Sequence, residues 1–365
     1  MKLKKIAFIK FGGLSSGGTE VSFQNVAKYF STKYCVDYFY CDSAPYIGSD
    51  WVHPDTDSYR KKFMENSNVN LRKFDVEFKD VTNELHTWVN TNFWEVFNEK
   101  YYDLVFITTA GKTEYPYNEI KSVPIVNIVT VNAGINNQEN IVKTILISED
   151  SAKLWLKQGG NEKTLKIIPL CREEINKNND DLRKSLNLQK KFIFGFHQRE
   201  DDTIFSEIPL KAYKKIADNL NYFLLLGGSK KYSEQAKDLN IKNFLQLKST
   251  SNLKNIYKFL NTLDVFTHGR KYGETMGLVL IEAMRFGLPV LSHKAKSNAQ
   301  IEVIGNAGSV FAKKNIFSYA NKMKKLQKNK HYYEVLSTSA LQRYENCYST
   351  QSILKKYDDL VNEIF

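Results

Sequence analysis

The sequence predicts an α/β protein with two domains, each built on a sheet of parallel strands. Its 365 residues are enough for two domains of ordinary size, each with a core of its own. From Phe192 to Leu260, short apolar runs alternate regularly with helical patterns. Strand–helix–strand units of this kind connect by right-handed crossovers and form open parallel sheets. At the start of the chain, the apolar run Lys5–Phe11 leads into a glycine-rich loop and then a helical pattern, which favours the same class of fold.

The first half contains short β-branched runs separated by turns, which we expect to form buried parallel strands. Apolar residues recur at helical spacing over residues 23–30, directly after the glycines, and predict the first helix. Two further helices are predicted at Asn83–Asn98, with Trp88 and Trp94 as core residues, and at Ile147–Gly160. The strands that we expect here are Cys35–Tyr40, Leu104–Thr108, Ile125–Val131, Thr144–Ser148 and Leu165–Ile168.

The second half reads as a regular alternation of strands and helices, followed by a helical tail. A polar stretch between Pro169 and Asp180 is where we expect one domain to end and the next to begin. From Ile316 onward the chain is rich in lysine and forms three helical segments. The expected strands are Phe192–Phe196, Tyr222–Leu226, Phe244–Leu247 and Val265–Thr267, with another from Pro289, and the expected helices are Ile208–Asn219, Ser233–Asp238 and Leu253–Leu260.

Two carboxylates frame the segment that follows the strand Val265–Thr267. Glu274 lies in a polar loop, Glu282 lies on the next helix, and seven residues separate them. This helix is predicted to begin near Thr275–Gly277. The first backbone N–H groups of a helix have no partner within the helix. We therefore expect those between Glu274 and Leu278 to offer a site for phosphate or for sugar hydroxyls.

This segment resembles the nucleotide-binding signature of the group 1 family of retaining glycosyltransferases, in which two glutamates are separated by seven residues. The resemblance extends to Ala299–Gly308, which is similar to the family's next segment, and to Gly12–Phe30, which is similar to its glycine-rich first loop and helix. It covers both ends of the chain. The matching residues of the signature are Glu274, Gly277, Glu282, Ala283, Gly287 and Pro289.

The resemblance implies the GT-B fold, in which two Rossmann-like domains face a central cleft. Residues 1–172 would form an acceptor domain and residues 173–349 a nucleotide-sugar donor domain, with a last helix at about 350–365 packing back on the first. The polar stretch Asp42–Arg72, with Trp51, His53, Tyr59 and Arg60, would then be the acceptor region. So long an irregular stretch is usually functional or mobile, and an ordinary surface excursion is the alternative.

The resemblance also implies roles for individual residues. Glu282 would hold the ribose hydroxyls of the donor, Glu274 would orient the donor sugar, and Arg199 would neutralise the diphosphate. Glu274, Arg199 and Asn132 are thus the predicted catalytic residues. The predicted donor-binding residues are Gly13, Gly17, Gly18, His268, Thr275, Met276, Gly277, Leu278 and Glu282.

The chain departs from the family pattern at three places. Asn132 stands where members often carry a histidine, and an asparagine cannot titrate near neutral pH. The lysine that the family usually carries shortly after the arginine at position 199 is absent, and Thr203–Phe205 occupies its place. The usual Ile-Pro-Asn-Gly is kept only in its first half, at Ile168–Cys171. For Arg199, the alternative is an ordinary solvated position on the surface. For the glycine loop, the alternative is a tight turn that binds nothing, because the spacing of its glycines is not Gly-x-Gly-x-x-Gly.

Net charge is +12 and is concentrated in the second half. Residues 1–172 hold 21 Lys and Arg against 20 Asp and Glu, a balance of +1, and residues 173–365 hold 31 against 20, or +11. An excess of positive charge suits a domain that binds a nucleotide diphosphate, and a solvated lysine-rich surface explains part of it. The near-neutral first half argues against a nucleic-acid partner, which requires a basic stripe.

These features predict a hexosyltransferase-type enzyme that moves a sugar from a nucleotide-diphospho-sugar to a glycan or lipid-linked acceptor, as in polysaccharide biosynthesis. We expect no cofactor and no metal, because no Asp-x-Asp pair occurs near the cleft segments. Four scattered cysteines fit reduced thiols in the cytoplasm. No apolar run reaches the length of a membrane span or a secretory signal, whereas lysine-rich patches allow peripheral membrane contact. The alternatives are a catalytically inactive GT-B protein that binds nucleotide sugars and a GT-B epimerase.

Overall fold

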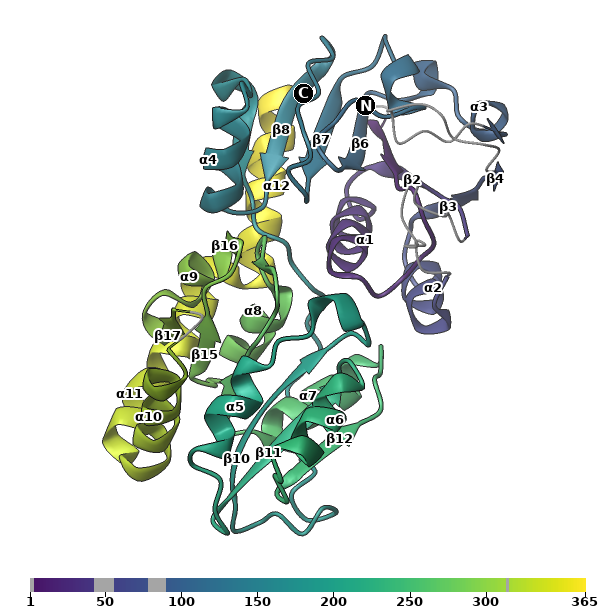
Figure 1. The fold of residues 1–365 in the computed structure, drawn as a ribbon. Helices are drawn as coiled ribbons and strands as arrows, with labels where there is room; N and C mark the ends of the chain where they lie inside the picture. The colour runs from purple at the N-terminus through teal and green to yellow at the C-terminus, as the bar shows by residue number, and fades with distance from the viewer. Residues whose placement is uncertain (1–2, 43–55, 78–89, 313–314) are drawn as a thin grey trace. The chain divides into compact units, whose positions relative to one another are not determined.

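A computed structural model describes residues 3–42, 56–77, 90–312 and 315–365. The chain divides into two compact units (Figure 1). The first domain comprises residues Met1–Glu173 together with Ile353–Phe365, and the second comprises Glu174–Ser352. Each domain contains one large parallel sheet, which is the fold class that the alternating pattern of the sequence predicts.

The first domain is built on a seven-stranded sheet with the order β3-β2-β1-β6-β7-β8-β9, in which every neighbouring pair is parallel. A small antiparallel pair, β4 (Val76–Glu77) and β5 (Asn90–Thr91), is separate from this sheet. The strands of the large sheet are β1 (Lys5–Ile9), β2 (Cys35–Tyr40), β3 (Asn70–Lys73), β6 (Leu104–Thr109), β7 (Ile125–Val129), β8 (Ile141–Leu146) and β9 (Leu165–Ile167).

Aromatic side chains hold the helices of the first domain on its sheet. Phe8 of β1 stacks on Phe106 of β6 with ring centroids 4.8 Å apart, and it meets Phe23 of the first helix edge-on at 5.0 Å. The last helix runs beside β8 (Figure 1), where Lys143 of β8 pairs with Glu363 at 3.1 Å. The helices are α1 (Gly18–Phe30), α2 (Ser58–Glu65), α3 (Phe93–Val96), α4 (Glu149–Lys157) and α12 (Thr350–Ile364), of which residues 353–364 belong to this domain.

The second domain has a six-stranded parallel sheet with the order β12-β11-β10-β13-β15-β17. Two short strands, β14 (Gly273–Glu274) and β16 (Ser297–Asn298), pair with each other outside it. The strands of the sheet are β10 (Phe192–Gln198), β11 (Asn221–Gly227), β12 (Phe244–Leu247), β13 (Val265–Thr267), β15 (Val290–His293) and β17 (Gly308–Phe311).

Seven helices belong to the second domain among the described residues, and the lysine-rich tail forms the three helical segments that the sequence predicts. The buried Tyr319 of α10 donates a hydrogen bond to the carbonyl of Leu291 in β15 at 3.0 Å, so the tail is held on the sheet by a polar contact as well as by packing. The helices are α5 (Ile208–Lys214), α6 (Lys231–Asp238), α7 (Leu253–Thr262), α8 (Leu278–Arg285), α9 (Ala299–Ile304), α10 (Ile316–Lys328) and α11 (Lys330–Arg343).

Several of the predicted elements end earlier than the sequence pattern indicates. The helix predicted for Ile208–Asn219 ends at Lys214, where the side chain of Asn221 donates to the carbonyl of Ile216 at 2.9 Å and so stabilises a turn. The strand predicted for Ile125–Val131 ends at Val129. Polar side chains that bond to nearby backbone offer the chain an alternative to a continued helix.

The helix predicted for Asn83–Asn98 is wrong in its described part. Residues 83–89, and with them Trp88, lie outside the described residues. Residues 90–98 contain only β5 and the four-residue α3. Asn92 Oδ1 accepts a hydrogen bond from the backbone of Asp75 at 2.8 Å, so its side chain supports the β4–β5 pair instead of a helix. Trp94 is 38% exposed and is not a core residue.

The interpretation of Asp42–Arg72 as one irregular stretch is also wrong where the structure describes it. Residues 43–55, including Trp51 and His53, lie outside the described residues, whereas α2 and most of β3 lie within the remainder. Tyr59 is half-buried and Arg60 is fully buried. Arg60 donates to Gln24 of α1 at 2.7 Å and pairs with Glu173, the last residue of the first domain before the chain enters the second. Arg60 therefore has a structural role in the first domain.

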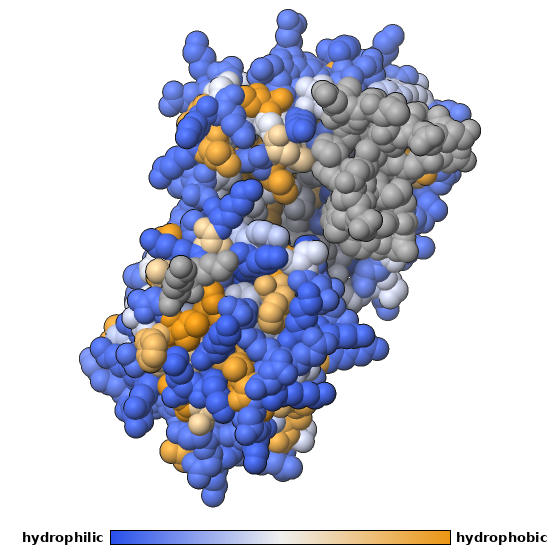
Figure 2. All heavy atoms as spheres, viewed as in Figure 1, coloured by the Kyte–Doolittle hydropathy of each residue, from blue (hydrophilic) through white to orange (hydrophobic). Residues whose placement is uncertain are grey.

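No helix among the described residues combines the length and the apolar character needed to cross a bilayer. Figure 2 shows a face that is mostly hydrophilic, with hydrophobic side chains gathered in small separate groups.

We expect Arg60→Ala to destabilise the first domain by roughly 3–5 kcal/mol, because it leaves the carboxylate of Glu173 largely buried without its partner. The neighbouring Lys61→Ala removes only a solvent-exposed pair with Glu65 and should change stability by no more than about 0.5 kcal/mol. Urea unfolding followed by circular dichroism measures both. Equal midpoints for the two variants would show that the buried pair contributes nothing specific.

Candidate functional site

The candidate site lies where the strand order of the second sheet reverses. β10 is followed by β11 and β12 on one side of it, while β13 and then β15 continue on the other side. Loops that leave two such neighbouring strands diverge, and ligands of open parallel sheets bind beyond the carboxyl ends of the strands at this point. His197 and Gln198 end β10, and His268 directly follows β13.

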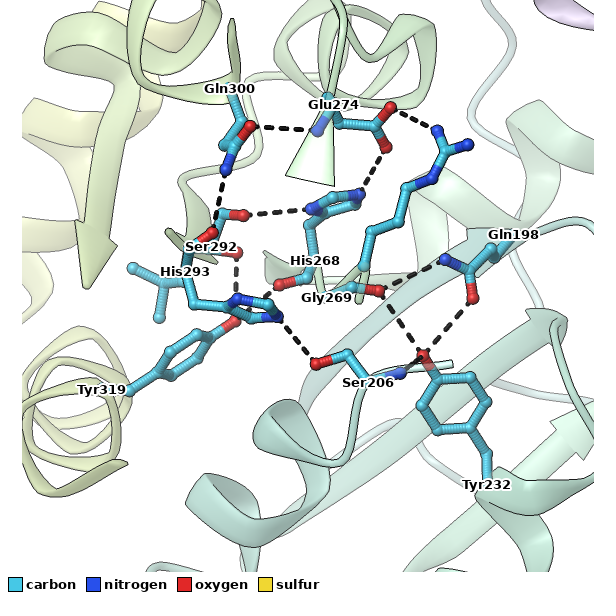
Figure 3. Close-up of polar contacts among 12 residues, drawn as sticks. Gln198, Ser206, Tyr232, His268, Gly269, Glu274, Ser292, His293, Gln300 and Tyr319 are labelled. Carbon is cyan, nitrogen blue, oxygen red and sulfur yellow. Dashed lines mark hydrogen bonds and ion pairs between the residues drawn. The ribbon is translucent and has the colours of Figure 1, made fainter. Parts of the chain in front are cut away.

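Glu274 is buried at this edge and is held at both its backbone and its carboxylate. The short β14–β16 pair fixes its backbone, and its N–H donates to Oε1 of Gln300 in α9 at 3.1 Å. Its Oε1 lies 2.8 Å from Nε2 of His268, and its Oε2 accepts from Arg270 at 2.6 Å (Figure 3). The side chain is only 7% exposed. The expectation of unpaired N–H groups at this helix start is wrong for Glu274 itself, because Gln300 already takes its N–H.

The electrostatic environment keeps Glu274 ionised. Burial raises the pKa of this carboxyl group, but the charge of Arg270 and the hydrogen bond from His268 outweigh burial, so the pKa is lower than the ordinary value of a glutamate. A buried carboxylate is tolerated when a cation and hydrogen-bond donors compensate its charge. At neutral pH the site therefore presents a fixed negative charge.

Glu282 lies on α8 and is 5% exposed. Its Oε2 is 2.9 Å from Nε2 of His197, without hydrogen-bond alignment, so the contact is an electrostatic one that becomes an ion pair when His197 is protonated. This contact links α8 to the end of β10. Both carboxylates of the sequence motif are thus buried at the carboxyl edge of the second sheet.

The start of α8 requires a glycine. Gly277 has φ +93°, a left-handed conformation that side-chain-bearing residues rarely adopt. A Cβ atom there would lie 2.8 Å from Leu280 Cδ1 and 3.0 Å from Cγ of Glu274, so the side chain of Glu274 packs directly against the helix start. α8 begins at Leu278, next to Thr275, which is exposed, and Met276, whose side chain is buried.

Arg199 directly follows β10, and its side chain is 57% exposed. It donates from Nε to Asp201 Oδ2 at 2.9 Å, and its NH2 lies 2.7 Å from the same oxygen. Asp201 also accepts from the backbone of Thr203, which fixes the loop. The arginine that directly binds a carboxylate of the motif is Arg270, which the predicted set of site residues does not contain.

The glycines predicted to bind the donor in the first domain lie between β1 and α1. Gly13 is in the loop, Gly17 caps α1 and Gly18 is its first residue. A Cβ on Gly17 would lie 2.2 Å from Oε2 of Glu20, whose other oxygen pairs with Lys10 at 3.3 Å. The carboxylate that lies beside this glycine loop is therefore that of Glu20, on α1.

Asn132 lies in the loop after β7, because that strand ends at Val129. Its Nδ2 donates to the backbone carbonyl of Ser151 in α4 at 2.6 Å. Its Oδ1 is buried and has no hydrogen-bond partner among the described residues. The amide nitrogen therefore connects this loop to α4.

Sequence reasoning missed His197, Ser292 and Gln300, each of which contacts a residue of the predicted site. His197 ends an otherwise apolar strand, and this polar residue at a strand end was the available signal. Ser292 and Gln300 gave no such signal, because their contacts depend on the pairing of β15 and on the position of α9. Among the described residues, no cluster of three or more His, Cys, Asp or Glu could hold a metal ion.

Comparison with known proteins finds a family match in the second domain. Residues 177–343, nearly all of the second domain, match the family described as Glycosyl transferases group 1. The chain is a glycosyltransferase. The carboxylate pair at the start of α8 lies within the matched residues. No curated protein sequence matches the chain.

Solved glycosyltransferases share the fold of this enzyme over its whole length. HepE of Anabaena, in complex with UDP and glucose, is 16% identical with a TM-score of 0.74, covering 99% of this chain and 100% of its own. A glycosyltransferase from Rickettsia africae is 14% identical with a TM-score of 0.73, covering 99% and 98%. Sucrose-phosphate synthase of Thermosynechococcus elongatus is 15% identical with a TM-score of 0.70, covering 99% of both chains. These similarities confirm the GT-B fold with two Rossmann-like domains.

We expect Gly277→Ala to destabilise the enzyme by more than the roughly 1–2 kcal/mol that a left-handed backbone costs an alanine, because the new methyl group also displaces Leu280 and Glu274. Gly159→Ala is a matched control, since Gly159 has φ +98° and its Cβ would make only an ordinary contact of 3.5 Å with Ile135. Thermal or chemical unfolding of the two variants gives the comparison. Equal losses would mean that the helix start tolerates the methyl group.

The lowered pKa of Glu274 gives a second prediction, on the pH dependence of stability. A carboxyl group whose pKa is depressed by folding stabilises the protein above its ordinary pKa, near 4.5, and this contribution is lost as the pH falls through the folded-state value. The difference in melting temperature between wild type and Glu274→Gln should therefore be largest near neutral pH and shrink below about pH 4.5. A difference that stays constant down to acidic pH would contradict an ionised, stabilising Glu274.

Proposed function

We propose that this enzyme is a retaining glycosyltransferase that moves a hexose from a nucleotide-diphospho-sugar to a glycan or lipid-linked acceptor. The single observation that carries the proposal is the buried pair Glu274 and Glu282 at the switch point of the second sheet, on either side of the start of α8. One member of the pair packs against the helix start and the other lies on the helix, so a ligand at the helix N-terminus would meet both.

The chemistry assigns different tasks to the two carboxylates. Glu282 would accept hydrogen bonds from the ribose hydroxyls of the nucleotide, and Glu274 would accept them from the donor sugar. When the bond between the anomeric carbon and the diphosphate breaks, negative charge grows on the phosphate oxygens and positive charge on the sugar. Backbone dipoles at the start of α8 and the exposed Arg199 would stabilise the phosphate oxygens.

Retention of configuration means that the acceptor hydroxyl attacks the face that the diphosphate leaves. The proton of that hydroxyl would pass to a leaving phosphate oxygen, so no carboxylate nucleophile is required. Asn132, which the resemblance places near the reacting sugar, would take part only as a hydrogen-bond acceptor through its buried Oδ1, because its Nδ2 is bound to Ser151. The glycines at positions 13, 17 and 18 would approach the donor phosphates through their backbone.

UDP is the first nucleotide to test, because HepE, which shares the fold, was crystallised with UDP and with UDP-glucose. We propose that transfer needs no metal ion, since cationic side chains and helix dipoles supply the compensating charge. We also propose a cytoplasmic enzyme with peripheral membrane contact through its lysine-rich helices, which suits a lipid-linked acceptor in polysaccharide biosynthesis.

The test is transfer of sugar from a panel of nucleotide sugars, selected first by the rise in melting temperature that each produces. Glu282→Gln should lower kcat/KM by about 10- to 100-fold, the equivalent of one charge-assisted hydrogen bond. Glu334→Gln is the control, because Glu334 is exposed on α11, where it pairs with the exposed Lys330. NMR of the product's anomeric centre tests retention, and activity in excess EDTA tests independence from metal.

Binding without transfer would identify the alternative, an inactive GT-B protein that holds a nucleotide sugar. The experiment that separates the two is nucleotide release measured with and without acceptor. Release that depends on acceptor supports transfer, whereas full activity of both Glu282→Ala and Arg199→Ala would show that the site is assigned to the wrong residues.

A further inference from the structure

Two buried histidines occupy comparable positions at the carboxyl edge of the second sheet. His268 follows β13 and is 2% exposed, and His293 ends β15 and is 1% exposed. Each has one ring nitrogen close to a serine hydroxyl, Ser292 for His268 and Ser206 for His293 (Figure 3). The two rings differ in what their other nitrogen binds.

Both ring nitrogens of His268 are engaged within the protein. Nε2 lies 2.8 Å from Oε1 of Glu274, and an ionised carboxylate only accepts hydrogen bonds, so Nε2 carries the proton. Nδ1 lies 3.0 Å from Oγ of Ser292, which donates to it when the ring is neutral. With the ring buried and both nitrogens occupied, His268 has no polar atom left for a ligand.

We propose that His268 is a positioning residue that acts on the reaction through Glu274, and that it does not contact the donor as the sequence resemblance implies. The inference rests on the proposed function of Glu274 in orienting the donor sugar. Ser292 lies behind the ring and sets its tautomer, so the line Ser292–His268–Glu274 fixes the rotation of the carboxylate.

The groups around Glu274 divide into one rigid donor and one exposed donor. The charged or titratable groups that act on it are His268, from the end of β13, and Arg270, from the following loop. α9 contributes the neutral amide of Gln300 to its backbone, and α8 contributes Gly277. The side chain of Arg270 is 30% exposed, so it can turn toward an arriving anion. The buried His268 cannot, and it therefore keeps Glu274 in place when Arg270 moves.

His293 provides a matched control within the same sheet. Its Nδ1 lies 3.0 Å from the carbonyl oxygen of Lys294, so Nδ1 carries the proton and Nε2 accepts from Ser206 at 2.7 Å. Its hydrogen bonds thus end on a hydroxyl and on the backbone, and not on Glu274. Replacing His293 disturbs the core as much as replacing His268 does and leaves the hydrogen bonds of the carboxylate intact.

The first test needs no substrate. In protein labelled with ¹³C at the glutamate carboxyl carbon, the resonance of Glu274 is assigned by its loss in Glu274→Gln and is titrated with pH. We expect the pKa of Glu274 to rise in His268→Ala and to stay unchanged in His293→Ala. His268→Gln, whose Nε2 donates from a similar position, should restore part of the wild-type value and serves if the alanine variant does not fold. An unchanged titration in both His268 variants would overturn the proposal.

The second test measures the consequence for transfer. His268→Ala should lower kcat/KM by about 10-fold or more, the loss of one hydrogen bond to a charged group, and move the acidic limb of its pH profile to higher pH. Affinity for UDP alone should change less than twofold, because UDP lacks the sugar that Glu274 orients. The proposal would be overturned if His268→Ala and His293→Ala lowered kcat/KM equally. It would also be overturned if His268→Ala lowered the affinity for UDP by the same factor as kcat/KM. A wild-type enzyme that turns over no nucleotide sugar would instead contradict the proposed function, and the NMR titration would still decide the role of His268.

Discussion

A buried negative charge on Glu274 is the constraint on which the candidate site depends. A carboxylate on a side chain that is only 7% exposed is unfavourable unless hydrogen-bond donors surround it. The second domain supplies these donors from two places, His268 after β13 and Arg270 in the next loop, while Gln300 on α9 accepts a hydrogen bond from the backbone N–H of Glu274. The two-residue strand β14, the glycine at the start of α8 and the pairing of β16 all serve to keep the carboxylate at this point.

The junction between the domains shows the same principle of compensated charge. Glu173, the last residue of the first domain at this junction, pairs with the buried Arg60 and accepts from Asn25 at 3.2 Å. Glu174, the first residue of the second domain, accepts from the hydroxyl of Tyr344 and from the backbone of Thr350 at 3.0 Å. Each domain therefore holds its own end of the connecting peptide by a carboxylate.

The positive charge of the second half contributes to the site through few residues. Of the cations near the carboxyl ends of β10 and β13, Arg199 is balanced by Asp201 and Arg270 by Glu274. Both guanidinium groups are thus already paired with carboxylates of the chain, with which any anionic ligand would have to compete.

The amino-acid sequence alone was enough to predict the fold class and the order of nearly all strands and helices of the second domain. These follow from local rules, since apolar periodicity and the glycine–proline pattern act between residues that are close along the chain. It failed over residues 90–98, where the side chain of Asn92 bonds to the backbone of Asp75 and a helix does not form. It also failed over α2 and β3, which the weak periodicity of that stretch does not indicate. It also could not show that Arg60 is buried.

Which side chains surround the two glutamates depends on the tertiary structure. His197, Ser292 and Gln300 come from three different elements, and their contacts arise from the strand order of the sheet, which no single segment encodes. The tertiary structure likewise showed that both nitrogens of His268 are occupied and that Arg270 binds Glu274 directly. Periodicity determines which face of an element is buried, whereas the partners of a buried polar group depend on which elements become neighbours in space.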